Sequence, residues 1–220
     1  MSIKTSILSS IGQKLLLATS GLIMFLLFLI PHMGGNVLFL FGPELFNSYA
    51  HHLHKLVPIV IGIEVLMLVS ISVHMIMGIR VVLANKKAAA KRLSQKSSAK
   101  RSLAARLMPV SGVMIFIFIV KHLLDFTLGG DKAEIDMHGE TGYDVYGMVL
   151  AKFQDPVHMA FYVLFMVAVG LHLSHALQSA LQTYGIFVPR EGSKIKKVSA
   201  VIATLMAATF AIIPIVAFTR

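Results

Sequence analysis

Four histidines lie deep inside apolar segments of this sequence: His32, His74, His122 and His172. An ionisable side chain inside a run long enough to cross a bilayer is costly unless something binds it, so each is a candidate functional residue. Imidazole binds metals and also carries protons. Gly78 lies one turn beyond His74 on the same helix face, and its bare backbone is a place where a flat cofactor could lie.

The apolar segments that carry these histidines are long enough to be transmembrane helices. Five of them follow one another, at about 14–41, 57–84, 107–128, 156–183 and 198–218. Hydrophobic residues make up 56% of the 220 residues and charged residues only 14%, which excludes an ordinary soluble domain. We therefore expect an all-α integral membrane protein, a single domain over residues 1–220 built as a bundle of five transmembrane helices.

The charged residues between the spans predict the orientation of the bundle. Linkers 86–106 and 190–197 are basic, which places them and the N-terminus in the cytoplasm, and segments 42–56 and 129–155 outside. Leucine and tyrosine recur every fourth residue in 44–56, which predicts a short interfacial helix after the first span. The net charge of +10 could suggest a nucleic-acid partner, but its concentration beside the spans favours a topology signal and contact with lipid.

The four histidines fall at two depths in the bilayer. At about 1.5 Å per helical residue, His32 and His122 lie roughly 27 and 24 Å from the cytoplasmic ends of their spans. His74 and His172 each lie roughly 18 Å from that side. Two levels with two imidazoles each are what two bis-histidine b-type haems require. The sequence has no cysteine, which excludes a thiolate-ligated haem and an iron–sulfur cluster held by this chain alone.

Residues near the histidines are candidates for holding the rest of such a cofactor. A backbone carbonyl one turn earlier or the Ser70 hydroxyl could bind the second ring nitrogen of His74. Three cationic or potentially cationic side chains could pair with haem propionates: Arg80, Lys121 and His175. Lys121 is also placed to pair with Asp125, four residues on. A lone membrane histidine often bonds across helices, but four histidines matched in depth favour haem.

The segments around the four histidines resemble the diheme cytochrome b anchors of succinate dehydrogenases and fumarate reductases. The matching segments are LFLIPHMGGN around His32, SVHMIMGIR around His74, FIVKHLL around His122 and GLHLSHALQSALQTYGIF around His172. The resemblance covers essentially the whole chain. It implies that His74 and His172 hold a proximal haem near an iron–sulfur subunit, and that His32 and His122 hold a distal haem.

The same resemblance implies the partners and the location. A flavoprotein subunit would interconvert succinate and fumarate, and an iron–sulfur subunit would dock on the cytoplasmic face. Menaquinone would be the lipid electron carrier, and the chain would be a multi-pass protein of the bacterial cytoplasmic (inner) membrane. A higher oligomer of the complex is compatible with this arrangement.

Carboxylates and further histidines are candidates for quinone and proton sites. A carboxylate after the first span serves quinol oxidation in some members of that family; Glu44 is the nearest match, with His51 and His54 as further proton carriers. A solvated amphipathic helix explains these three residues equally well. Glu64 lies inside the second span, where a carboxylate should be protonated or paired, and is a candidate proton relay. Some fumarate reductase anchors carry a glutamate two residues before the fourth histidine, where this chain has Gly170.

Two other functions fit parts of the pattern. A proton-coupled transporter would use the histidines and Glu64 as a proton path, and a structural anchor would carry one haem or none. We expect instead the electron-transfer subunit of a succinate:quinone oxidoreductase, with no dehydrogenase active site in this chain.

Overall fold

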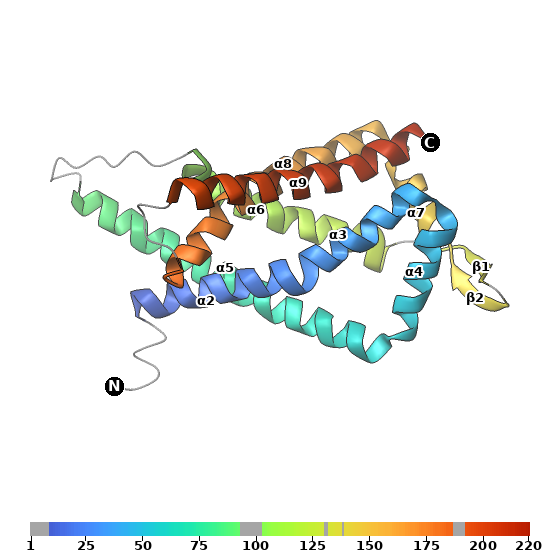
Figure 1. Cartoon of the computed structure of the whole chain (residues 1–220), viewed down its shortest axis with the longest axis horizontal. Helices are drawn as coiled ribbons and strands as arrows, with labels where there is room; N and C mark the ends of the chain where they lie inside the picture. The colour runs from blue at the N-terminus through green and yellow to red at the C-terminus, as the bar shows by residue number, and fades with distance from the viewer. Residues whose placement is uncertain (1–8, 93–102, 130–131, 138, 187–191) are drawn as a thin grey trace.

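The computed structural model describes residues 9–92, 103–129, 132–137, 139–186 and 192–220. Its long helices run side by side along one axis, and the C-terminus lies at the opposite end from the start of α2 (Figure 1). Within these residues, five helical segments are long and apolar enough to cross a membrane: Ser10–Phe41, Val57–Ala88, Ala105–Leu128, Pro156–Thr183 and Lys194–Thr219. The predicted all-α membrane protein with five spans is confirmed, and its orientation stays a prediction.

Parts of the segments on which that orientation depends are outside the described residues. They are residues 93–102 of the linker 86–106, and residues 190–191 of the linker 190–197.

The first span is a chain of helical pieces rather than one uniform α-helix. The pieces are α2 (Ser10–Ile23), the π-helical η1 (Met24–Leu29), α3 (Ile30–Val37) and the 3-10 helix η2 (Leu38–Phe41). Gly42 follows with a φ of 108°, a left-handed conformation that glycine adopts without steric cost. The chain then turns at Pro43 into α4 (Pro43–Lys55), which runs across the end of the bundle (Figure 1). A helix is therefore present in the predicted segment 44–56, and its place at the membrane surface stays a prediction.

Three of the remaining spans are single α-helices, and the other is an α-helix that continues as a π-helix. They are α5 (Val57–Arg92), α6 (Leu103–Leu123) with the π-helical η3 (Leu124–Leu128), α8 (Pro156–Thr183) and α9 (Gly192–Thr219). Asp155 caps α8, because its side chain accepts a hydrogen bond from Val157 N at 2.9 Å, and Pro156 is the first helical residue.

The described residues of segment 129–155, which the sequence predicts to lie outside, form regular elements. It contains the antiparallel strands β1 (Glu134–Met137) and β2 (Glu140–Tyr143), followed by α7 (Val145–Phe153). The buried Asn47 ties α4 to this segment: its amide donates to Asp144 Oδ1 at 2.9 Å, and its carbonyl accepts from Tyr146 N at 2.8 Å. The hairpin, α4 and α7 thus gather at one end of the bundle (Figure 1).

The packing places the four histidine-bearing helices around one another. Helix α2 packs against α5 and α8, α6 packs against α8, and α9 packs along α8. The largest buried cluster lies at the end with α4 and α7 and includes Phe39, Tyr146, Phe153 and Tyr162. Many large apolar side chains of α5 and α6 are exposed, as expected for helices that face lipid.

Candidate functional site

His74 on α5 and His172 on α8 face each other inside the bundle and are called the inner pair below. Their ring centroids lie 6.2 Å apart with an interplanar angle of 60°. A metal–imidazole bond of about 2.0 Å on each side, plus about 1.1 Å from nitrogen to ring centre, would place two axial imidazoles about 6 Å apart. The spacing of the inner pair therefore fits one metal ion between the rings.

The Nδ1 atoms of the inner pair already have partners. Leu17 O lies 3.1 Å from His74 Nδ1, and Ser111 Oγ lies 3.2 Å from His172 Nδ1. Ser20, rather than the predicted Ser70, is the hydroxyl beside His74, at 3.4 Å. These contacts leave Nε2 of each ring as the atom that can bind a metal.

His32 on α3 and His122 on α6 form a second pair, called the outer pair below. Their ring centroids lie 5.8 Å apart at an interplanar angle of 84°. Phe28 stacks on His32 at 5.0 Å, and Phe118 stacks on His122 at 5.5 Å, so aromatic contacts fix both rings. Phe126 also contacts His122, with ring centroids 5.2 Å apart.

The polar atoms of the outer pair are less well satisfied than those of the inner pair. Among the described residues, the buried His122 Nδ1 has no hydrogen-bond partner. Asn36 Nδ2 lies 3.3 Å from His32 Nε2, a contact that metal binding at this atom would have to displace. The outer pair therefore fits a shared metal ion by its spacing, with a local rearrangement of Asn36.

The two pairs lie at two levels of the bundle. Gly21 lies beside the His74 ring and Gly112 beside the His172 ring. His32 is 11 residues beyond Gly21 and His122 is 10 residues beyond Gly112, so the levels are roughly 15 Å apart. The structure thus brings together the same two pairs of histidines that were grouped by their predicted depth in the bilayer.

A π-helical segment lies close to each outer histidine. The first, η1, ends at Leu29, three residues before His32, and η3 begins at Leu124, two residues after His122. Segments of this kind change the rotation of a helix locally and are frequent at functional sites. The sequence analysis did not predict them.

Neither pair could hold a bare metal ion alone. Within the part of the chain that the structure describes, no group of three or more His, Asp or Glu residues could hold a metal. Two imidazoles leave most positions of an ion open, and a porphyrin supplies four nitrogens in one plane between them. The donor set therefore fits a haem better than an isolated ion.

The structure describes the surroundings of three other predicted cofactor residues, Gly78, Arg80 and His175. A Cβ added at Gly78 would meet the side chain of Leu17 at 3.7 Å. Arg80 is exposed on α5, and His175 Nδ1 lies 3.1 Å from Gln178 Nε2. Their contact with a cofactor stays a prediction.

A buried carboxylate cluster next to the outer pair contains two residues that the sequence analysis missed. Lys121 pairs with Asp125, as their spacing of four residues predicts, and Lys121 Nζ lies 2.6 Å from Asp125 Oδ2. Tyr162 OH donates to the same oxygen at 2.7 Å, and His158 Nε2 lies 3.3 Å from it. Tyr162 and His158 were missed because one tyrosine and one histidine near the start of a span are common at a membrane interface.

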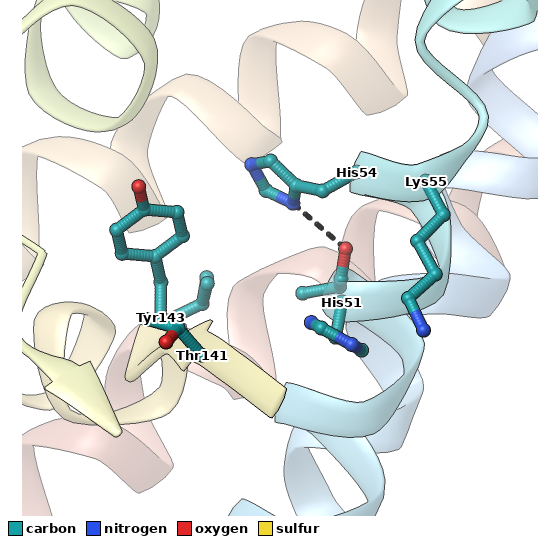
Figure 2. Close-up of a pocket in the computed structure, with 7 residues that line it drawn as sticks. His51, His54, Lys55, Thr141 and Tyr143 are labelled. Atoms are coloured by element: carbon teal, nitrogen blue, oxygen red, sulfur yellow. Dashed lines mark hydrogen bonds between the residues drawn. The ribbon is translucent and has the colours of Figure 1, made fainter. Parts of the chain in front are cut away.

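The quinone candidates His51 and His54 line one cavity between α4 and β2. The cavity has a volume of about 120 Å³ and is also lined by Ala50, Lys55, Thr141, Tyr143 and Val145. Figure 2 shows His54 and Tyr143 turned toward each other, and their ring centroids are 5.9 Å apart. This volume is below the roughly 150 Å³ of an engineered protein cavity that binds benzene, so the cavity can receive one edge of an aromatic headgroup rather than enclose two fused rings.

Glu140 of β2 holds the hairpin against α4. It pairs with Lys55 and with His51 Nε2, the latter at 2.8 Å. These hydrogen bonds from Lys55 and His51 lower the pKa of Glu140 from 4.5 to about 2. A lowered carboxylate pKa contributes stability that is present above the unfolded value and lost as the pH falls toward 2. The contact therefore persists at neutral pH.

The two carboxylates proposed for proton transfer are not part of this cavity. Glu44 is exposed in the first turn of α4, and Glu64 is exposed on α5. The structure brings together His51 and His54 but does not bring either carboxylate to them.

One known protein supports the resemblance inferred from the histidine segments. The chain is 25% identical over 170 residues to the succinate dehydrogenase cytochrome b558 subunit of Bacillus subtilis (strain 168), and the match covers 77% of each chain. No protein-family model and no solved structure matches. Together with the five apolar helices, this similarity confirms that the chain is a multi-pass membrane protein resembling the cytochrome b subunits of succinate dehydrogenase.

Proposed function

We propose that this chain is the cytochrome b membrane anchor of a succinate dehydrogenase or fumarate reductase. It would transfer electrons between the iron–sulfur subunit of the complex and menaquinone with the help of two b haems. The observation that carries the proposal is the two facing histidine pairs at two levels of one bundle. The oxidation of succinate or reduction of fumarate belongs to a partner flavoprotein.

The residues of the inner pair would bind haem iron through Nε2, because their Nδ1 atoms are held by other groups. His32 and His122 would bind the second haem, with Phe28 and Phe118 stacked on their rings. Bound haem would supply one-electron transfer, at a potential set by its ligands and surroundings. The apolar helices around both pairs keep bulk water away from them.

The cavity between α4 and the hairpin is the best candidate for the quinone headgroup. It lies at the end of the bundle that carries the outer pair, and its lining offers imidazole, hydroxyl and ammonium groups. A pocket with a few convergent polar groups beside an apolar bilayer suits a ring with two carbonyl oxygens. His51 and His54 are the proton carriers in this proposal.

The test of the function is the haem content of the purified complex. A dithionite-reduced spectrum should show b-type α bands, and haem extraction should give two haems per copy of this chain. A spectrum without these bands would favour the proton-coupled transporter. One haem per chain would favour a structural anchor with a single haem, and a chain without haem would contradict the proposal under either alternative.

His54→Gln is expected to lower quinone turnover several-fold and to leave the haem content at two per chain. His52→Gln is the matched control. Both side chains bond the carbonyl four residues earlier, Ser48 O at 2.7 Å and Ala50 O at 2.8 Å, but only His54 lines the cavity. Glu44→Gln, tested in the same assay, is also expected to lower turnover. Equal turnover in all three variants and wild type would place the quinone elsewhere.

A further inference from the structure

Two Ser-Gly dipeptides face the rings of the inner pair in the same way. Ser20-Gly21 on α2 lies against His74, and Ser111-Gly112 on α6 lies against His172. Both serines are buried, with 4% and 3% of their surface exposed. The sequence patterns did not predict a role for any of these four residues.

On α2, one helical turn supplies two acceptors to His74. Leu17 O lies 3.1 Å from His74 Nδ1, and Ser20 Oγ lies 3.4 Å from the same atom. The Ser20 hydroxyl donates its hydrogen to Leu16 O at 2.7 Å. A hydroxyl has one hydrogen, so toward the ring Ser20 can only accept.

On α6 the arrangement is repeated with the same spacing. Ser111 Oγ lies 3.2 Å from His172 Nδ1. The Ser111 hydroxyl donates to Met108 O at 3.1 Å. In both helices the order is therefore a carbonyl, a hydroxyl three residues on, and a glycine directly after it.

These contacts decide the tautomer of both rings. Because each Nδ1 faces acceptors, Nδ1 carries the hydrogen and Nε2 keeps its lone pair. The lone pair on Nε2 is the one that can bind a metal between the rings. Helices α2 and α6 thus prepare His74 and His172, which lie on α5 and α8, for axial ligation.

The two glycines leave space for the histidine rings, and the clearance differs between them. A Cβ at position 21 would lie 3.1 Å from His74 Cε1, closer than most real Cβ contacts. A Cβ at position 112 would lie 3.5 Å from His172 Cε1, an ordinary van der Waals contact. Alanine in place of Gly21 should therefore displace the His74 ring, whereas alanine in place of Gly112 should leave the His172 ring where it is.

We propose that Ser20-Gly21 and Ser111-Gly112 are positioning residues that set the reduction potential of the haem held by the inner pair. An acceptor on Nδ1–H makes the imidazole a more basic ligand, which favours the oxidised iron. The inference rests on the proposed function, since the quantity that it predicts is a haem potential. The outer pair lacks this arrangement, because the buried His122 Nδ1 has no hydrogen-bond partner among the described residues.

The experiment is a redox titration of both haems in the intact complex, with Ser20→Ala, Ser111→Ala and the double variant. Each single variant should raise the midpoint potential of the inner haem, the double variant should raise it further, and the outer haem should not move. Ser20→Thr and Ser111→Thr keep a hydroxyl and should return the potential toward the wild-type value. Haem content is measured on every variant to show that the protein is assembled.

Two other serines serve as matched controls. Ser72 and Ser174 each lie two residues from a ligand histidine, but their hydroxyls donate to Leu68 O and Leu171 O of their own helices, at 2.7 and 2.8 Å. Ser72→Ala and Ser174→Ala should leave both potentials unchanged. Gly21→Ala should alter the low-spin electron paramagnetic resonance signal of the inner haem, whereas Gly112→Ala should leave it close to wild type.

The outcomes separate this inference from the proposed function. Two haems per chain, with an inner potential that does not respond to either serine, or with both potentials shifting equally, would overturn the positioning role and leave the function standing. A wild-type complex without haem would overturn both.

Discussion

His74→Ala is expected to remove one haem and to leave the other with its own α band. The imidazole of His74 is one of two side chains that could bind an ion between α5 and α8, and alanine supplies no donor in its place. His172→Ala should remove the same haem. Haem extraction and reduced-minus-oxidised spectra of the purified complex measure the loss as a fall from two haems per chain to one.

Combining substitutions tests the pairing itself. His74→Ala with His172→Ala should still cost one haem, because both residues belong to one site. His74→Ala with His122→Ala should cost both haems, because the two levels are roughly 15 Å apart and substitutions at that distance act independently. If His74→Ala with His172→Ala cost both haems, and His74→Ala with His122→Ala cost only one, the histidines would pair differently from what the ring distances suggest.

The main features of the bundle could be predicted because they depend on local sequence patterns. Long apolar runs predict the spans, Gly42-Pro43 marks a helix end, and Asp155-Pro156 marks a helix start. The grouping of His74 with His172 also follows from counting helical rise, because nearly straight helices convert residue number into depth. These inferences need no knowledge of which side chains meet.

Contacts between distant segments could not be predicted in the same way. The sequence predicts a backbone carbonyl one turn earlier or the Ser70 hydroxyl as the partner of the His74 ring, whereas Leu17 O and Ser20 Oγ of α2 lie beside its Nδ1. Which serine meets the ring depends on the rotation of α2 against α5. A single sequence contains no direct signal for that rotation.

Segment 129–155 shows a second limit of prediction from a single sequence. Its strands have four residues each, too few for an alternating pattern to stand out from a polar loop. They form a stable hairpin against α4 through Glu140, whose partners Lys55 and His51 are more than 80 residues away. The fold of this end thus depends on contacts between distant segments, including these ion pairs and the buried Asn47.

The second large effect is expected at the carboxylate cluster beside the outer pair. Asp125→Ala removes a buried carboxylate that accepts hydrogen bonds from Tyr162 and Lys121, and leaves both donors without this partner. Because the Lys121 side chain is 38% exposed, the pair is only partly buried, and its loss should cost less than the about 3 kcal/mol of a fully buried ion pair. The unfolding temperature of the solubilised complex should therefore fall clearly, with haem content measured alongside it.

Tyr162→Phe is the matched variant with the smaller expected effect. It removes one hydroxyl, keeps the ring that packs on Phe153 and Phe118, and leaves the Asp125–Lys121 pair in place. The loss of one such hydrogen bond costs about 1 to 2 kcal/mol. The expected order is thus a large fall for Asp125→Ala and a small one for Tyr162→Phe.

Adding Lys121→Met to Asp125→Ala separates charge from packing. The Lys121 side chain is 38% exposed and that of Asp125 only 8%, so much of the attraction on the lysine side is screened. The double variant should recover part of the stability lost in Asp125→Ala, because it leaves no unpaired ammonium group in the span. If Asp125→Ala costs no more than Tyr162→Phe, the aromatic cluster rather than the carboxylate holds this end of the bundle, since the rings remain in both variants.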